Sequence, residues 1–173
     1  MTGAMGKISS EKGYRKMLAE FAKSLPELAA DRTKRCGEAG ENMVGIYFSG
    51  TGNTKHCVEK LIHLLDGTAR AVPMEQKGAA DLLREEDFIV LGYPVQYSNV
   101  PVMVRDFIQS NSGLWKSKNV LCVATMALFS GDGAGCAARL LEKFGANVLG
   151  GLHIRMPDSI CDVRLLKRSP EKE

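Results

Sequence analysis

The sequence lacks long uncharged runs, closely spaced cysteine pairs and a strong excess of either charge. No run approaches the roughly 20 apolar residues of a membrane-spanning helix, so we expect no membrane partner. The five cysteines are odd in number and form no Cys-x-x-Cys pair, so we expect reduced, mostly packed thiols and no metal site. The net charge of +3 is too small to indicate nucleic-acid binding. These features are typical of a cytoplasmic protein.

Two common phosphate-binding motifs are also missing from the glycine-rich stretch 49–54, which reads SGTGNT. A Walker A loop would end in Gly-Lys-Ser/Thr, but Lys55 follows a threonine here. A Rossmann fingerprint would need a third glycine three positions after Gly52, where Lys55 stands. The stretch is therefore neither of these two loops.

The same stretch nevertheless has the composition of an anion site. An apolar run at 44–48 predicts a buried strand, and apolar residues at helical spacing predict a helix ending at Leu65. The first N–H groups of a helix have no intrahelical partners, and the helix dipole adds partial positive charge there. Hydroxyl donors and flexible glycines complete the predicted phosphate site, whose residues are Ser49, Gly50, Thr51, Gly52, Asn53 and Thr54.

The pattern Ser-x-Thr-Gly-Asn-Thr directly after a buried strand resembles the FMN phosphate loop of flavodoxins. The resemblance implies that FMN binds with its phosphate on 49–54. The alternative from the residues alone is a capped turn, rich in serine and threonine, that holds no ligand.

A second stretch, 92–101, resembles the flavodoxin loop Gly-x-Pro-x-Tyr-x-Gly-x-x-Pro, whose backbone approaches the flavin ring. Gln96 stands at the usual tyrosine, Tyr97 comes one place later, and Ser98 replaces a glycine whose peptide hydrogen-bonds the reduced flavin in that family. Tyr97 either contacts the ring or packs on the helix after Pro101. The resemblance implies flavin contacts from Pro94, Val95, Gln96, Tyr97, Ser98 and Asn99.

A third stretch, 125–135, has three glycines in its last five residues. It resembles the third flavin loop of flavodoxin domains that are fused to ferredoxin modules. The resemblance implies flavin contacts from Thr125, Ala127, Leu128, Phe129 and Gly131. Asp132 is expected to cap the helix that follows.

Strands and helices alternate along the chain. Strands are predicted near 44–48, 69–73, 87–95, 119–125 and 147–156, with helices near 79–84, 101–110 and 133–144 between them. This alternation predicts an α/β fold with a three-layer, doubly wound, five-stranded parallel sheet. With the phosphate loop after the first strand, the expected order is 2-1-3-4-5, as in flavodoxins.

The domain organisation follows from the same pattern. Residues 43–173 are expected to form the flavodoxin-like domain, with its fifth helix truncated or replaced. Residues 1–42 are expected to form an N-terminal helical extension and linker. The apolar stripe of the extension should dock on the sheet face that carries the helix ending at Leu65; its residues are Tyr14, Met17, Leu18, Phe21 and Leu25.

The resemblance implies an FMN-binding electron-transfer protein, monomeric or weakly dimeric, that exchanges electrons with a partner such as a ferredoxin or a reductase. The sequence offers no catalytic acid, base or nucleophile, so an enzymatic activity is left open. Two alternatives remain. One is an NAD(P)H-dependent quinone or flavin reductase on the same fold, and the other is a non-redox interaction module whose flavin site has lapsed.

Overall fold

The computed structural model describes residues 23, 43–65, 67–127 and 131–156. The strands are β1 (Met43–Tyr47), β2 (Arg70–Pro73), β3 (Phe88–Pro94), β4 (Asn119–Met126) and β5 (Asn147–Arg155). The helices are α2 (Asn53–Leu65), α3 (Ala79–Glu85), α4 (Val102–Ser110) and α5 (Gly133–Lys143), with a short 3-10 helix at Ser112–Leu114. Apart from Lys23, the predicted N-terminal extension lies outside the described residues, as do its docking stripe and the C-terminal segment.

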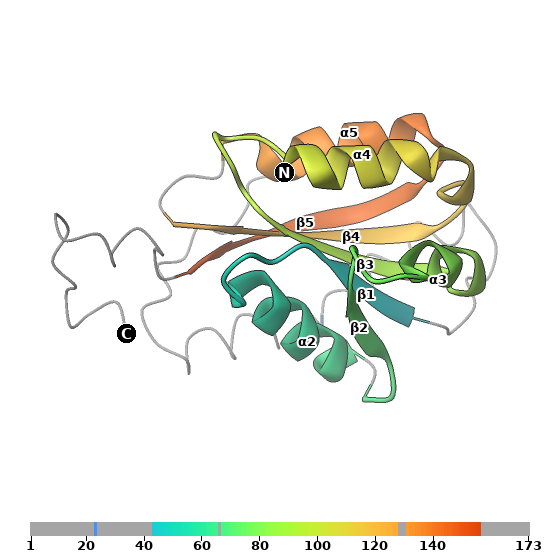
Figure 1. Ribbon diagram of the computed structural model, residues 1–173, viewed down its shortest axis with the longest axis horizontal. Helices are drawn as coiled ribbons and strands as arrows, with labels where there is room; N and C mark the ends of the chain where they lie inside the picture. The colour runs from blue at the N-terminus through green and yellow to red at the C-terminus, as the bar shows by residue number, and fades with distance from the viewer. Residues whose placement is uncertain (1–22, 24–42, 66, 128–130, 157–173) are drawn as a thin grey trace, which may run out of the picture.

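The sheet is parallel throughout and has the order β2-β1-β3-β4-β5. The predicted fold class and strand order are therefore confirmed. Figure 1 shows α2 on one side of the sheet and α4 and α5 on the other. In such a sheet the order reverses next to β1, and ligands bind outside the carboxyl ends of the strands at that point.

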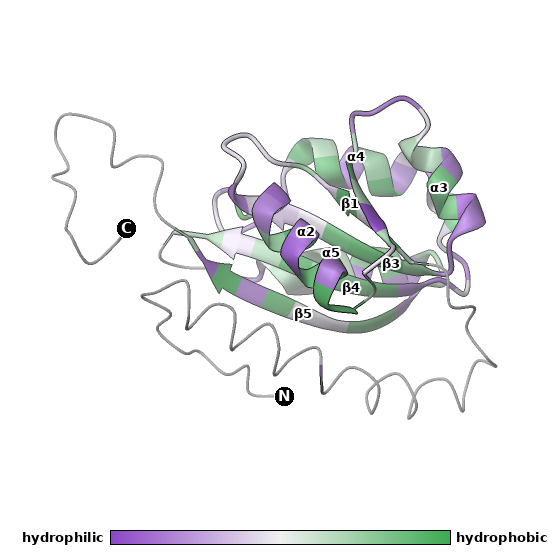
Figure 2. Cartoon of the chain, turned by 90° about the horizontal axis from the view of Figure 1, so that it is seen from below, coloured by the Kyte–Doolittle hydropathy of each residue, from purple (hydrophilic) through white to green (hydrophobic). Residues whose placement is uncertain are grey.

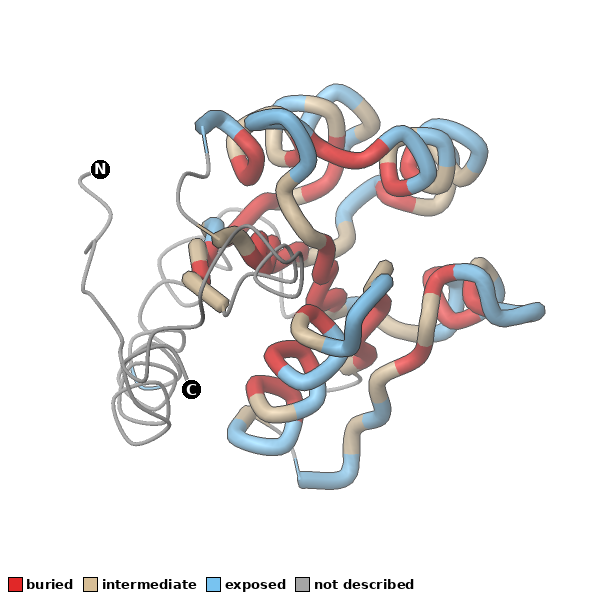
Figure 3. Tube along the Cα trace, turned by 60° about the vertical axis from the view of Figure 1, so that its left-hand side comes forward, coloured by how far each residue is buried: buried red, intermediate tan, exposed pale blue. Residues whose placement is uncertain are grey.

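The strands are apolar on both faces because helices cover both faces. One core cluster joins Ile46, Leu91 and Cys122 to α3, α4 and α5, while the other joins Val90 and Leu121 to α2. Consecutive strand residues thus alternate between the two clusters, as the two-residue period of a strand requires. Figure 3 shows the resulting band of buried residues through the middle of the molecule, and Figure 2 shows the polar residues on the outer sides of the helices.

The pairing of β4 with β5 contains one irregularity. Val120 pairs with Val148, but Leu121 pairs with Gly150, so Leu149 is an extra residue in β5. Such a bulge shifts the alternation of side chains by one position. As a result Leu152 packs on the α2 side, although it has the same parity as Val148 on the other side.

The position of Trp115 before the fourth predicted strand, far from the ligand end of the sheet, favours a packing role over flavin stacking, and the structure places this residue fully buried. Its indole Nε1–H donates to the Ile108 carbonyl at 2.9 Å, and its ring meets Phe107 edge-on with 6.4 Å between the centroids. Helical spacing predicts that Met103 points inward together with Val104, Phe107 and Ile108. This prediction is wrong for Met103, whose side chain is half exposed in the first turn of α4. Within the described part of the chain, no helix is long and apolar enough to cross a membrane.

Candidate functional site

The loop between β1 and α2 is organised around the hydroxyl of Ser49. Ser49 Oγ accepts hydrogen bonds from the backbone N–H of Gly52 at 3.1 Å and of Lys55 at 3.2 Å. Gly52 has a φ of 90°, which a residue with a side chain rarely adopts. A Cβ added to Gly50 or to Gly52 would meet nothing within 4 Å. The loop therefore presents its backbone to open space at the N-terminus of α2.

Thr54 connects this loop to the end of β4. Its side chain is buried, and its hydroxyl shares a 2.8 Å hydrogen bond with the hydroxyl of Thr125, which is also buried. Its methyl group lies over Gly92, where an added Cβ would come within 3.1 Å of it. The first loop and the third loop thus meet through two threonines 71 positions apart.

The second loop contains a tight hairpin. The Gln96 N–H donates to the Asn99 carbonyl at 3.0 Å, and the Asn99 N–H donates to the Gln96 carbonyl at 2.9 Å. The two central residues have left-handed backbones, with φ of 50° at Tyr97 and 59° at Ser98. Two positive values define a type I′ turn, which favours asparagine and glycine. Ser98 therefore occupies a position that suits the glycine found in flavodoxins.

Tyr97 stands at the tip of this hairpin with its side chain fully exposed. The alternative that Tyr97 packs on α4 is therefore wrong. Contact between Tyr97 and a flavin ring stays a prediction.

The hairpin lies directly against the third loop. Gly131 has a φ of 51°, and an added Cβ would lie 2.9 Å from Ser98 Oγ and 3.0 Å from Ser98 Cα. A Cβ on Gly133 would lie 2.7 Å from Val95 Cγ2. The Val95 N–H also donates to the Thr125 carbonyl at 2.7 Å, which continues the pairing of β3 with β4. The two glycines permit this close approach because they carry no side chain.

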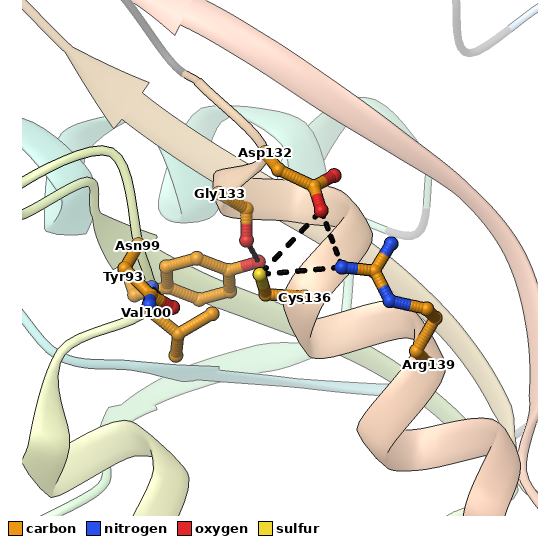
Figure 4. A network of polar contacts seen from close by, with 7 residues as sticks. All are labelled: Tyr93, Asn99, Val100, Asp132, Gly133, Cys136 and Arg139. Carbon is orange, nitrogen blue, oxygen red and sulfur yellow. Dashed lines mark hydrogen bonds and ion pairs between the residues drawn. The ribbon is translucent and has the colours of Figure 1, made fainter.

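Figure 4 shows the polar contacts beneath the second and third loops. The hydroxyl of Tyr93, a fully buried residue, donates to the Gly133 carbonyl at 3.1 Å. Burial raises the pKa of the Tyr93 hydroxyl far above its ordinary value, and burial raises the pKa of the nearby Cys122 thiol to about 12. Both groups are therefore neutral, and the tyrosine fixes the start of α5 relative to β3.

Asp132 occupies the N-cap position of α5, but its side chain makes no capping hydrogen bond, so that expectation is wrong. The carboxylate instead pairs with Arg139 about two turns further along, and the Cys136 thiol lies beside this pair, 3.4 Å from the Arg139 guanidinium and 3.6 Å from the carboxylate (Figure 4). The hydrogen bond from Arg139 lowers the pKa of Asp132. The N-terminus of α5 consequently begins with a paired negative charge.

Two side chains of β5 lie beside the third loop. Arg155 Nε donates to the Ala127 carbonyl at 2.9 Å. His153 is half-buried, and burial lowers its pKa, although the charge of Asp132 partly opposes this shift. Sequence reasoning missed Tyr93, Arg155 and His153 as neighbours of these loops. The contact of Tyr93 spans 40 positions of chain and that of Arg155 spans 28, and His153 interacts with Asp132 from another element of the fold.

The three loops thus meet at the carboxyl ends of β1, β3 and β4. The described members of the predicted site are all placed there; they are Ser49, Gly50, Thr51, Gly52, Asn53, Thr54, Pro94, Val95, Gln96, Tyr97, Ser98, Asn99, Thr125, Ala127 and Gly131. Leu128 and Phe129 lie outside the described residues. Among the described residues, no group of three or more histidine, cysteine or acidic side chains is arranged to hold a metal ion.

Comparison with known proteins agrees with this geometry. The sequence model of the family described as "Flavodoxin domain" matches residues 45–147, which is well over half of the chain. A search of curated proteins gave no match.

Solved structures show the same likeness. The two-electron reduced flavodoxin of Megasphaera elsdenii is 25% identical with a TM-score of 0.58, over 69% of this chain and 91% of that one. A flavodoxin from the domain Archaea is 18% identical with a TM-score of 0.55, over 68% and 85%. A flavoprotein of Lactobacillus acidophilus NCFM, solved in complex with FMN, is 15% identical with a TM-score of 0.53, over 66% and 93%; at these lower identities the likeness shows the fold. From the family match and the loop geometry together, this chain belongs to the flavodoxin domain family.

Proposed function

We propose that this chain binds FMN at the three loops and serves as an electron-transfer protein. The observation that carries the proposal is the loop before α2, whose backbone faces open space at a helix N-terminus. Membership of the flavodoxin domain family and the FMN-bound Lactobacillus flavoprotein of the same fold support FMN as the ligand.

The residues of the first loop fit a phosphate group. The backbone N–H groups of Gly52 and Lys55 both donate to Ser49 Oγ. Donors of this loop therefore converge at the N-terminus of α2, where an acceptor oxygen is favoured. Thr51 and Asn53 of the same loop would add a hydroxyl and an amide as neutral donors. Such a site attracts a phosphate dianion through oriented donors and the helix dipole and needs no metal ion.

The backbones of the second and third loops fit one side of a flat ring. The hairpin at Tyr97 and Ser98 contacts the glycine-containing loop at Gly131, so the two loops form one continuous surface. Flavin supplies the one- and two-electron steps when it is bound. The protein's task is to position the ring, exclude water from one side of it and leave an edge open.

The exposed apolar side chains near the second loop suit an electron-transfer partner. Tyr97 is fully exposed, Val102 is 63% exposed and Met103 is 50% exposed, and all three lie within seven positions of chain. Exposed aromatic and methionine side chains are enriched at protein contacts. The physiological partner and the oligomeric state, monomer or weak dimer, remain parts of this proposal.

A flavin titration tests the ligand. FMN added to flavin-free protein should bind with a shifted absorbance spectrum, with or without a chelator. The double variant Thr51→Ala/Thr54→Ala should bind at least about tenfold more weakly, since a hydrogen bond to a charged group contributes about 1.5–3 kcal/mol. Equal affinity in parent and variant, or strict dependence on magnesium, would contradict the phosphate site.

A kinetic assay tests the role. The loaded protein should oxidise NADPH very slowly alone and should accept electrons readily through a reductase protein. Rapid NADPH oxidation by the pure protein would favour a stand-alone reductase instead. A protein that takes up no flavin at all would favour a non-redox module.

A further inference from the structure

The hydroxyl groups of Thr54 and Thr125 form a buried pair beneath the first loop. Thr54 is 2% exposed and Thr125 is 3% exposed, and their hydroxyls lie 2.8 Å apart. Within the described ranges, neither hydroxyl has a second hydrogen-bond partner. Among the described residues, the two hydroxyls therefore bond only to each other.

Counting hydrogens shows that this pair is incomplete. Each hydroxyl carries one hydrogen and two lone pairs, so one shared bond uses only one of the two hydrogens. A buried donor without an acceptor is unfavourable. If Thr125 donates, the spare hydrogen belongs to Thr54, which stands in the first turn of α2 where an anion is favoured.

We propose that Thr125 is a positioning residue for the phosphate site. Its hydroxyl donates to Thr54 Oγ1, and the hydrogen of Thr54 is then available to a phosphate oxygen. This inference deepens the proposed function and rests on it. It differs from the sequence prediction that Thr125 contacts the flavin, because here Thr125 acts through Thr54.

The surroundings hold both side chains in place for this role. The methyl group of Thr54 packs over Gly92, where any side chain would collide with α2. Thr125 lies on the α2 side of β4, and its carbonyl accepts the N–H of Val95 at 2.7 Å. A hydroxyl fixed by the sheet thus orients a hydroxyl of the loop, and such chains of hydrogen bonds strengthen one another.

The test compares FMN with riboflavin, which lacks the phosphate. Thr125→Val should weaken FMN binding about fivefold to tenfold and change riboflavin binding by less than about twofold. Thr125→Ser keeps the hydroxyl and should restore FMN binding. Thr68→Val makes the same chemical change in the α2–β2 turn and should alter neither ligand. Valine is β-branched like threonine, so the variant should fold, and melting without ligand checks this.

A second probe is inorganic phosphate added to the flavin-free protein. Phosphate should raise the melting temperature of the parent chain and raise it less in Thr125→Val. If Thr125→Val weakens FMN and riboflavin binding equally, the proposal is overturned in favour of a contact between Thr125 and the ring. If it changes the binding of neither, the proposal is overturned as well, because the Thr54–Thr125 bond then serves only the protein's own structure. A parent chain that binds phosphate but not FMN would refute the proposed function alone, and one that binds neither would refute both.

Discussion

Ser98 and Gly131 lie so close together that Gly131 has no room for a side chain. An added Cβ would lie 3.0 Å from the Cα of Ser98, and Gly131 itself has a left-handed backbone. The hairpin of the second loop therefore rests on the third loop at one small contact. This contact joins the two loops that we propose as the site of the flavin ring.

The first prediction concerns this contact. Gly131→Ala should lower the free energy of unfolding by about 2–3 kcal/mol, of which about 1 kcal/mol comes from the left-handed backbone and the rest from overpacking. In a Ser98→Gly background the same change should cost about 1 kcal/mol less, because the side chain that collides is gone. Urea denaturation of the four proteins measures both costs. Strictly additive costs would show that the two residues do not contact each other.

The second prediction uses two serines with the same strained backbone. Ser98 has a φ of 59° and Ser117 a φ of 64°, but Ser117 lies before β4, at the opposite end of the sheet. Glycine at either position should change the free energy of unfolding by no more than about 1 kcal/mol. Only Ser98→Gly should make the first midpoint potential of bound FMN less negative, by on the order of tens of millivolts. Spectroelectrochemistry measures this potential in the parent chain and in both variants. Identical potentials in both variants would show that Ser98 does not belong to the flavin site.

The third prediction concerns Trp115. Replacement by phenylalanine removes the bond to the Ile108 carbonyl and leaves a cavity, so the free energy of unfolding should fall by about 2–4 kcal/mol. FMN affinity should stay within about twofold, because Trp115 precedes β4 and the loops follow the strands. Circular dichroism is the suitable probe, since the variant lacks the chain's one tryptophan. A large loss of FMN affinity in a folded variant would contradict this separation.

The fourth prediction is a dependence of stability on pH. Burial lowers the pKa of His153 in the folded state, so the unfolded chain binds a proton more readily. Stability from this group is complete above the ordinary histidine pKa of about 6.5 and is lost as the pH falls below it. His153→Gln should flatten the stability curve across that range in urea titrations at several pH values. An unchanged slope would assign the acid sensitivity to other groups.

Sequence patterns predicted the strands because each is a largely apolar run bounded by turns, and the strand order followed from the loop after the first strand and its resemblance to flavodoxins. They could not predict the turn at Tyr97 and Ser98, since neither residue is the glycine or asparagine that a type I′ turn favours. The pairing of Thr54 with Thr125 was equally invisible, because contacts across 71 positions depend on strand order and register together. Met103 shows another limit, since helical spacing does not say where the apolar face ends. The resemblance to flavodoxin–ferredoxin fusions stays a prediction.

The extra residue Leu149 reverses which face of the sheet the later side chains of β5 point to. Beyond it, Gly151 pairs with Cys122 and His153 pairs with Ala124, on the side of the sheet that α5 covers. Removing one residue there would rotate every later side chain of β5 to the opposite face. Leu152 and Ile154 would then face α5, and His153 would leave the neighbourhood of Asp132. The surroundings of the third loop are thus set by the length of β5 as well as by its composition, so a one-residue deletion would change them more than most substitutions.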